Sequence, residues 1–196
     1  MPAGAFELIL ASTSPYRRAL LERLGVPFRS VASGVDEDAI KGLGLPPRAV
    51  AERLALAKAE APAGEWPGAT LIGSDQVVAF DGRTLGKPGS LDAAIGQLTA
   101  MAGKPHELIT ALAVRHRGRV VTHTDVTTLW MRALGRVEIA RVVAADRPID
   151  CAGGYKLEGR GIALFERIES ADQAAIVGLP LIALTTILRG FGYRIP

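Results

Sequence analysis

The chain has 196 residues, of which 48% are hydrophobic and 22% are charged. This composition excludes an intrinsically disordered chain, and the length allows one domain with a sizeable core. The net charge of +3 arises from 23 basic and 20 acidic residues that are dispersed, whereas nucleic-acid-binding domains concentrate basic charge in stripes. We therefore expect one domain over residues 1–196 and no nucleic-acid partner.

The first predicted elements are a buried strand and a helix. Residues 8–11, Leu-Ile-Leu-Ala, form the continuously apolar run of a strand buried on both faces. Ser12-Thr13-Ser14-Pro15 follows with a serine N-cap and a proline for the first helical turn. The helix should extend to about Leu24 and end at Gly25, and residues 28–33 predict a second strand.

The start of this helix has the chemistry of a phosphate receptor. Two arginines, Arg17 and Arg18, lie in its first turn, where the helix dipole disfavours a cation by about 0.3–1 kcal/mol. A bound anion would reverse that effect, and free amides, the hydroxyls of Ser12 and Ser14 and two guanidinium groups could all contact it. A serine-capped surface helix with solvated arginines is the alternative.

An acidic segment and a lysine come next. Asp36-Glu37-Asp38 is predicted as a loop, and a helix from about Pro47 to Ala61 carries Lys58. Clustered carboxylates can bind a hard metal ion through oxygen ligands, but many such loops bind nothing. Lys58 is either a solvated charge or a site residue.

A polar triplet, Ser74-Asp75-Gln76, interrupts the apolar strand predicted over residues 70–80. An aspartate in such a run is costly unless it is paired or bound to a metal, so we assign Asp75 a functional role. Asp81-Gly82 predicts a hairpin. Lys87 follows the hairpin, and we expect it to fold back towards Asp75.

The rest of the chain alternates strands and helices. The basic residues 115–119 are interpreted as a hairpin turn between two strands. Alternating elements with two hairpins favour an α/β fold with a mixed, twisted sheet flanked by helices. The expected strands are His106–Arg115, Val120–Met131 and Gly161–Arg167, and the expected helices run from Ser90 to about Ala102, from about Val137 to Ala145 and from Pro180 to about Arg189.

Residues 151–161 are rich in glycine, which indicates close backbone approach or left-handed turns. Cys151 has no histidine or acidic partner in the sequence pattern, so we interpret it as a packed thiol and not as a nucleophile. The three histidines lack metal-ligand spacing, and no nucleophile elbow supports a serine hydrolase.

A cytoplasmic location is expected. The single cysteine cannot form an intramolecular disulfide, which favours a reducing compartment. The first seven residues lack the features of a signal peptide, and no apolar stretch approaches the roughly 18 residues of a membrane span. We therefore expect no membrane partner.

Taken together, these motifs resemble the Maf family of nucleoside triphosphate pyrophosphatases, from Leu8 to about Arg189. The resemblance implies a single ITPase-like α/β domain with a deep central cleft. It also implies cleavage between the α- and β-phosphates with a divalent cation (Mg²⁺, Mn²⁺ or Co²⁺), and family members often form homodimers. The matching segments are Ser-Thr-Ser-Pro-Tyr-Arg-Arg, Gly34-Val35-Asp36-Glu37, Leu-Ala-Lys58-Ala, Gly-Ser-Asp75-Gln76, Gly-Lys87-Pro88, Cys-Ala-Gly-Gly-Tyr-Lys-Leu-Glu158-Gly and Val177-Gly178-Leu179-Pro180.

The resemblance also implies roles for single residues. Asp75 matches the proposed proton acceptor, and Lys58 and Lys87 match catalytic positions beside the phosphates. Glu37, with Asp75, matches the metal site. The expected substrate contacts are Ser12, Ser14, Tyr16, Arg17, Arg18, Gln76 and Glu158.

Three positions point to a subgroup. Maf proteins that look selective for dTTP and UTP have arginine, threonine and glutamine at three positions. This resembling chain has Tyr16, Gln76 and Glu158 there. The subgroup similar to this chain acts on 7-methyl-GTP and usually has tryptophan at the first position. The methylated guanine ring is positively charged and should stack on an aromatic face with a gain of about 0.5–2 kcal/mol. Its two adjacent N–H donors suit the carboxylate of Glu158.

Three functions remain open. The first is hydrolysis of 7-methyl-GTP, which removes a non-standard nucleotide, and the second is hydrolysis of dTTP, UTP or a deaminated purine. The third is a nucleotide-sensing regulator of septum formation. Glu37, Asp75 and Lys87 favour an enzyme, because binding alone needs no general base.

Overall fold

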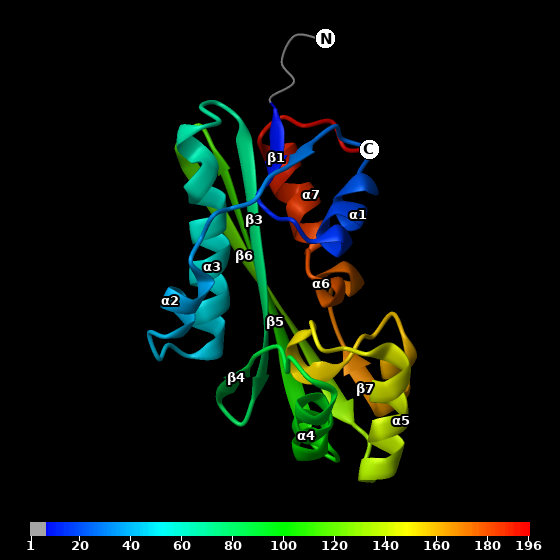
Figure 1. Cartoon of the computed structure of the whole chain (residues 1–196). Coiled ribbons are helices and arrows are strands. Elements are labelled where there is room, and N and C mark those ends of the chain that lie inside the picture. Colours follow the sequence, from blue (N-terminus) through cyan, green and yellow to red (C-terminus); the bar gives the residue numbers. More distant parts are fainter. Residues whose placement is uncertain (1–6) are drawn as a thin grey trace. The chain divides into compact units, whose positions relative to one another are not determined.

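The computed structural model describes residues 7–196 (Figure 1). The segment in which we expect no signal peptide falls largely on residues 1–6, outside the described residues. Among the described residues, no helix combines the length and the apolar character of a membrane span. In chain order the elements are β1 (Leu8–Leu10), α1 (Pro15–Glu22), β2 (Arg29–Ser30), α2 (Glu37–Lys41), α3 (Pro47–Glu60), η1 (Ala61–Gly64), β3 (Thr70–Phe80), β4 (Arg83–Leu85), α4 (Leu91–Met101), β5 (Pro105–His116), β6 (Arg119–Met131), α5 (Arg136–Asp146), η2 (Ala152–Gly154), η3 (Arg160–Leu164), β7 (Phe165–Glu169), α6 (Gln173–Val177) and α7 (Leu181–Gly190), where η marks a 3-10 helix.

The strands hydrogen-bond in the order β2-β1-β3-β5-β6-β7, and β4 pairs with β3. β1 runs parallel to β2 and β3, whereas β4 is antiparallel to β3 and β7 is antiparallel to β6. The prediction of an α/β fold with a mixed sheet flanked by helices is therefore confirmed.

The chain forms two compact units, and the long strands β3, β5 and β6 contribute to both. The first unit comprises residues up to 76 together with 110–125 and 172–196, and the second comprises residues 77–109 and 126–171. A single domain over residues 1–196 stays a prediction, as does the deep central cleft.

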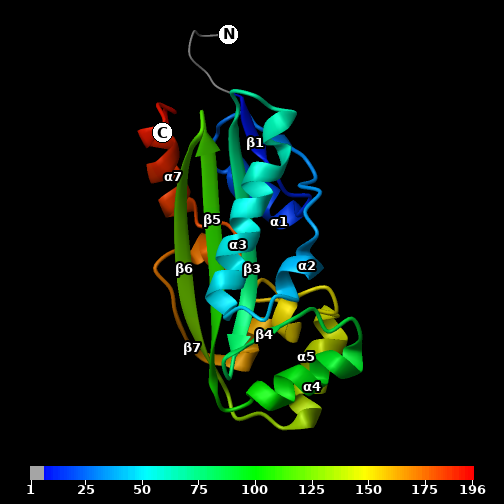
Figure 2. The ribbon, with the colours of Figure 1, turned by 90° about the vertical axis from the view of Figure 1, so that its left-hand side faces the viewer.

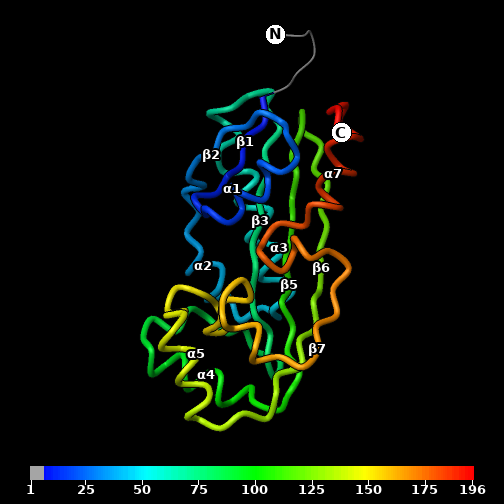
Figure 3. The backbone as a smooth tube through the Cα atoms, turned by 90° about the vertical axis from the view of Figure 1, so that its right-hand side faces the viewer, coloured from blue at the N-terminus to red at the C-terminus, as the bar shows by residue number. Residues whose placement is uncertain are grey.

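In the first unit, helices cover both faces of the sheet because the strand side chains alternate between them. Figure 2 shows α3 in front of the strands, and Figure 3 gives the view from the side of α1 and α7. The core on the α1 and α7 side is built from apolar side chains of β1, β3 and both helices, including Leu8, Leu10, Leu21, Ile72, Leu184 and Leu188.

On the other face, α3 packs directly on β3 because both elements present small residues. A Cβ atom on Gly73 would collide with the carbonyl oxygen of Ala55 and the amide nitrogen of Ala59. Only glycine permits so close an approach of backbone to backbone. The neighbour of Ala59 in α3, Lys58, is thereby held against the strand in a buried position.

In the second unit, the Asp81-Gly82 hairpin joins β3 to β4 as predicted. Both residues have positive φ values, 47° and 73°, as a tight two-residue hairpin turn requires. α4 packs against α5 and η2, and α5 packs against η3. The predicted cap of α4 is also present, since Ser90 Oγ accepts a hydrogen bond of 3.2 Å from the amide of Ala93.

Two predictions around the polar motifs are wrong. The triplet Ser74-Asp75-Gln76 does not interrupt its strand, because β3 continues through it without a break. Asp36-Glu37-Asp38 is not a loop either. Asp36 is the N-cap of α2, with Oδ1 3.0 Å from the amide of Ala39, and the next two acidic residues begin the helix, where its dipole favours them.

The strand predicted over Gly161–Arg167 begins four residues later, at Phe165, because residues 160–164 form η3. The amide of Gly161 donates a hydrogen bond of 2.8 Å to Asp146 Oδ2, which holds this turn against the end of α5. The short helix α6 was not predicted.

Candidate active site

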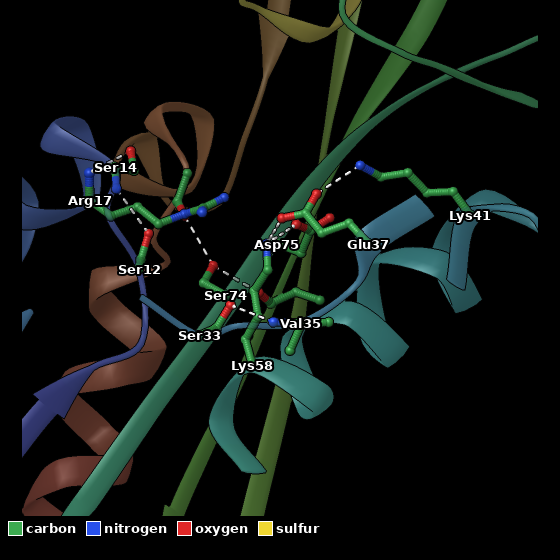
Figure 4. A network of polar contacts seen from close by, with 12 residues as sticks. Ser12, Ser14, Arg17, Ser33, Val35, Glu37, Lys41, Lys58, Ser74 and Asp75 are labelled. Atoms are coloured by element: carbon green, nitrogen blue, oxygen red, sulfur yellow. Dashed lines mark hydrogen bonds and ion pairs between the residues drawn. The ribbon is translucent and has the colours of Figure 1, made fainter. Parts of the chain in front are cut away.

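Lys58 lies between two carboxylates in the first unit (Figure 4). Its Nζ is 2.7 Å from Asp75 Oδ1 and 2.7 Å from Glu37 Oε1. The three residues come from α3, β3 and α2. The side chains of Lys58 and Asp75 are only 7% and 8% exposed, so each charge requires a partner. The ammonium group of Lys58 therefore offsets the cost of burying the Asp75 carboxylate in an apolar strand.

The network extends outward to Lys41, which follows Glu37 by one turn of α2. Lys41 Nζ lies 2.7 Å from Glu37 Oε2, so each carboxylate oxygen of Glu37 contacts a lysine. Partial burial alone would raise the pKa of Glu37, but hydrogen bonds from Lys41 and Lys58 lower it to about 2. Glu37 is consequently ionised throughout the neutral range.

Asp75 has the opposite tendency. Burial raises its pKa above the ordinary aspartate value, and the charges of Lys58 and Arg17 oppose that rise. The result is a carboxylate more basic than a surface aspartate, which is the property required of a general base.

The start of α1 brings Arg17 to the same network. Ser14 is the N-cap, its Oγ accepting from the amide of Arg17 at 3.4 Å, and Ser12 Oγ accepts from the amide of Ser14 at 3.2 Å. Burial lowers the pKa of Arg17, whereas Asp75 and Glu37 raise it. Figure 4 shows the guanidinium group pointing from α1 toward these two carboxylates.

Gln76 faces the opposite side of β3 from its neighbour Asp75. Its Nε2 lies 2.9 Å from Thr110 Oγ1 and 3.0 Å from the carbonyl oxygens of both Ala175 and Ile176. The amide nitrogen thus binds the end of α6. A contact of Gln76 with the nucleobase stays a prediction.

Four other predicted residues are exposed, two in the first unit and two in the second. Arg18 is paired with Glu22 on the surface of α1, with Nε 3.1 Å from Oε1, and Tyr16 is exposed on the same helix. Lys87 and Glu158 are exposed residues of the second unit, Lys87 between β4 and α4 and Glu158 between η2 and η3. Their roles stay predictions.

Cys151, in the second unit, has the properties of a packed thiol. Its Sγ donates to Asp150 Oδ1 at 3.6 Å. Burial and the nearby Asp150 carboxylate raise the pKa of Cys151 to about 11. A thiol that stays protonated at neutral pH is a poor nucleophile.

A sequence profile decides the family. The profile of the Maf-like proteins matches residues 7–191. The chain belongs to the Maf-like protein family. The resemblance expected from the motifs is therefore confirmed over nearly the whole length of the chain.

Relatives of this Maf-like chain are similar from end to end. A protein of Xanthomonas axonopodis pv. citri named 7-methyl-GTP pyrophosphatase is 49% identical over 189 residues, which cover 96% of this chain and 98% of that protein. A protein of the same name from Bdellovibrio bacteriovorus is 47% identical over 182 residues, or 93% and 95% of the two chains. A solved HAM1 protein from Coxiella burnetii aligns with a TM-score of 0.44 and 13% identity over 66% of this chain and 75% of that one.

The carboxylates of the Maf-like site fit the divalent cation that the family implies. Glu37 and Asp75 reach one lysine nitrogen from two elements, so their oxygens lie close together, and Mg²⁺ prefers oxygen ligands. Residues 7–196 contain no cluster of three or more His, Cys, Asp or Glu side chains able to hold a metal. An ion here would complete its coordination with phosphate oxygens and water, as Mg²⁺ does in nucleotide enzymes.

Two residues of the network were not predicted. Lys41 had a sequence signal, because a lysine four residues after Glu37 in a helix forms an ion pair with it. Ser74 had no signal for its contacts, since the backbone carbonyls it reaches are 37 and 104 residues away.

Proposed function

We propose that this chain hydrolyses a nucleoside triphosphate to the monophosphate and pyrophosphate, with 7-methyl-GTP as the preferred substrate. The observation that carries the proposal is the buried Lys58, shared by Glu37 and Asp75 and accompanied by Arg17. Relatives 47–49% identical along their length carry the name of this activity, which supports the choice of reaction.

In the proposed reaction, Asp75 accepts a proton from a water molecule that attacks the α-phosphorus. A bond forms between the water oxygen and phosphorus, while the bond from phosphorus to the α–β bridging oxygen breaks. Pyrophosphate departs with that electron pair. The raised pKa of Asp75 suits it to this proton transfer.

Cationic side chains compensate the charge of the triphosphate and of the departing pyrophosphate. Arg17 and Lys58 supply this charge in the first unit, and Lys87 has the same role by the family resemblance. Arg17 offers a planar fork for phosphate oxygens, whereas Lys58 acts as a point charge.

Glu37 and Asp75 would hold the divalent cation, Mg²⁺, Mn²⁺ or Co²⁺. When bound, such an ion neutralises charge on phosphate oxygens. Lys58 contacts Oδ1 of Asp75 at 2.7 Å, and we propose that the two oxygens of this carboxylate divide the ligand and base roles between them.

Base recognition is proposed to depend on Tyr16 and Glu158. A tyrosine ring attracts the cationic 7-methylguanine by about 0.5–2 kcal/mol, and a carboxylate accepts both donors of the guanine edge. The enzyme would thereby remove a non-standard nucleotide from the cytoplasmic pool.

The test is an assay of pyrophosphate release from 7-methyl-GTP, GTP, dTTP and UTP with each of Mg²⁺, Mn²⁺ and Co²⁺. The proposal expects the highest kcat/KM with 7-methyl-GTP. Faster cleavage of dTTP or UTP would show that base recognition is wrongly assigned. If none of the triphosphates is cleaved with any of the ions, the interpretation as a nucleotide-sensing regulator is favoured.

A further inference from the structure

We propose that Ser74 is a positioning residue that acts through the carbonyl oxygen of Gly178 to orient the guanidinium group of Arg17. The inference rests on the proposed function, in which Arg17 contacts the phosphates. Ser74 has a buried, uncharged hydroxyl group and takes no part in the proposed proton transfer.

One backbone oxygen connects the two side chains. Ser74 is fully buried in β3, and its Oγ lies 3.0 Å from the carbonyl oxygen of Gly178 and 2.9 Å from that of Ala111. Its single proton is shared between these two acceptors. The carbonyl oxygen of Gly178 also accepts a hydrogen bond of 2.8 Å from Arg17 Nε. Ser74 and Arg17 therefore meet at the same atom.

The segment that carries this oxygen is fixed on several sides. Gly178 ends α6, where the last carbonyl groups lack helical partners. Thr110 Oγ1 donates to the carbonyl oxygen of Ala175 at 2.9 Å. Gln76 Nε2 donates to the same oxygen and to the carbonyl oxygen of Ile176. Side chains from β3 and β5 thus anchor the end of α6.

The position also requires glycine. Gly178 has a φ of 116°, in the region that side chains rarely adopt, and an added Cβ would lie 3.4 Å from Arg17 Nε. A side chain at this position would strain the backbone that presents the carbonyl oxygen to Arg17 and would crowd the guanidinium group.

This anchor determines which donors of Arg17 remain for a ligand. With Nε bound to the backbone, the two terminal NH₂ groups are left to form the fork that binds phosphate oxygens. A side chain held in one orientation binds more tightly than one that must be ordered on binding. Without the Ser74 hydroxyl, the carbonyl of Gly178 loses a partner and Arg17 loses part of its restraint.

The experiment is a double-mutant cycle with Ser74→Ala and Arg17→Ala. We measure KM and kcat for 7-methyl-GTP, GTP and dTTP, and the dissociation constant of inorganic pyrophosphate. Ser74→Ala should raise KM and the pyrophosphate constant by about three- to tenfold for every base, with little change in kcat. In the Arg17→Ala background the same substitution should have almost no further effect.

Two variants separate positioning from a general loss of stability. Thr127→Val removes another buried hydroxyl, 2.9 Å from Ser170 Oγ in the second unit, and should lower stability without changing KM. Thr110→Val weakens the anchor of α6 by a different contact and should reproduce the KM pattern of Ser74→Ala. It keeps the test decisive if Ser74→Ala does not fold.

Independent effects of the two substitutions, or a change confined to one nucleobase, would overturn the inference and leave the proposed function in place. The pyrophosphate titration measures the coupling even if no triphosphate is cleaved. Failure of the proposed function and failure of this inference are therefore distinguishable.

Discussion

Lys58 Nζ and Asp75 Oδ1 lie 2.7 Å apart, and both side chains are almost completely buried. The two partners are not equivalent. If Asp75 loses its charge, Lys58 still has Glu37 as a partner at 2.7 Å. If Lys58 is removed, Asp75 is left buried without its closest cation. Substitutions at the two positions should therefore have different consequences.

Asp75→Asn should reduce kcat by about 10²–10⁴-fold, because an amide of the same size cannot accept the proton. The fold should persist, since Glu37 still neutralises Lys58. The measurements are pyrophosphate release and thermal unfolding. Asp125→Asn, at another buried aspartate of the first unit, is the matched control and should leave kcat unchanged. Activity of Asp75→Asn within threefold of wild type would remove Asp75 from the mechanism.

Lys58→Met should move the acidic limb of the pH profile to higher pH. Asp75 must be deprotonated to act as a base, so kcat/KM falls as pH falls through its pKa. In the wild type, burial raises this pKa above the ordinary value of about 3.9, and Lys58 restrains the rise. Removing the cation releases that restraint. A profile of kcat/KM against pH checks the shift, and a limb that stays in place or moves to lower pH would contradict the role of Lys58.

Local chemistry in the sequence was enough to place several features. Ser14 and Pro15 start α1, and Asp81-Gly82 forms its hairpin, because caps and turns depend on residues a few positions apart. The cost of burying a carboxylate likewise indicated that Asp75 is either paired or bound to a metal. Each of these inferences needed only the neighbouring sequence.

Contacts between distant segments could not be derived in this way. The sequence showed that Asp75 needs a partner but not that the partner is Lys58, which depends on the close approach of α3 at Gly73. The break wrongly predicted in β3 has the same cause, because it also depended on contacts with distant segments. Ser74 satisfies its hydroxyl on backbone carbonyls far along the chain, so the strand continues through the polar triplet.

Lys41→Met should lower the Mg²⁺ concentration needed for half-maximal activity by about three- to fivefold. Lys41 contacts Glu37 Oε2 at 2.7 Å and competes with a cation for that oxygen. Two unit charges about 4 Å apart in water interact by about 1 kcal/mol, which corresponds to about a fivefold change in binding. Calorimetric titration with Mg²⁺ alone gives a second readout. Arg48→Met breaks an equivalent exposed pair with Glu52 and should change neither value, whereas a weaker Mg²⁺ response in Lys41→Met would refute the competition.

The stability of the protein should fall between pH 6.5 and pH 5 because of His106. This side chain is buried, with Nε2 2.9 Å from the Tyr155 hydroxyl, and burial lowers its pKa to about 4. The unfolded chain, with a histidine pKa of about 6.5, binds more protons in this range, so stability is lost as pH falls. The loss should be about 2 kcal/mol by pH 5.

Denaturant unfolding at pH 6.5 and pH 5 measures this loss directly. His106→Gln keeps a hydrogen-bonding side chain but cannot titrate, so its stability should depend less on pH than that of the wild type. His123→Gln, at an exposed position, is the control and should retain the full pH dependence. Equal slopes for wild type and His106→Gln would assign the effect to other groups.

Tyr16→Ala and Glu158→Gln should change base selectivity in different ways. Wild type should prefer 7-methyl-GTP over GTP by only about five- to thirtyfold, because one cation–π contact is worth about 1–2 kcal/mol and both bases share the donor edge. Tyr16→Ala removes the aromatic face and should erode that preference. Glu158→Gln replaces a charged acceptor and should weaken both guanine nucleotides relative to dTTP. The kcat/KM values of three substrates with each variant separate the two effects. Identical changes in the kcat/KM ratios of both variants would mean that neither residue recognises the base as proposed.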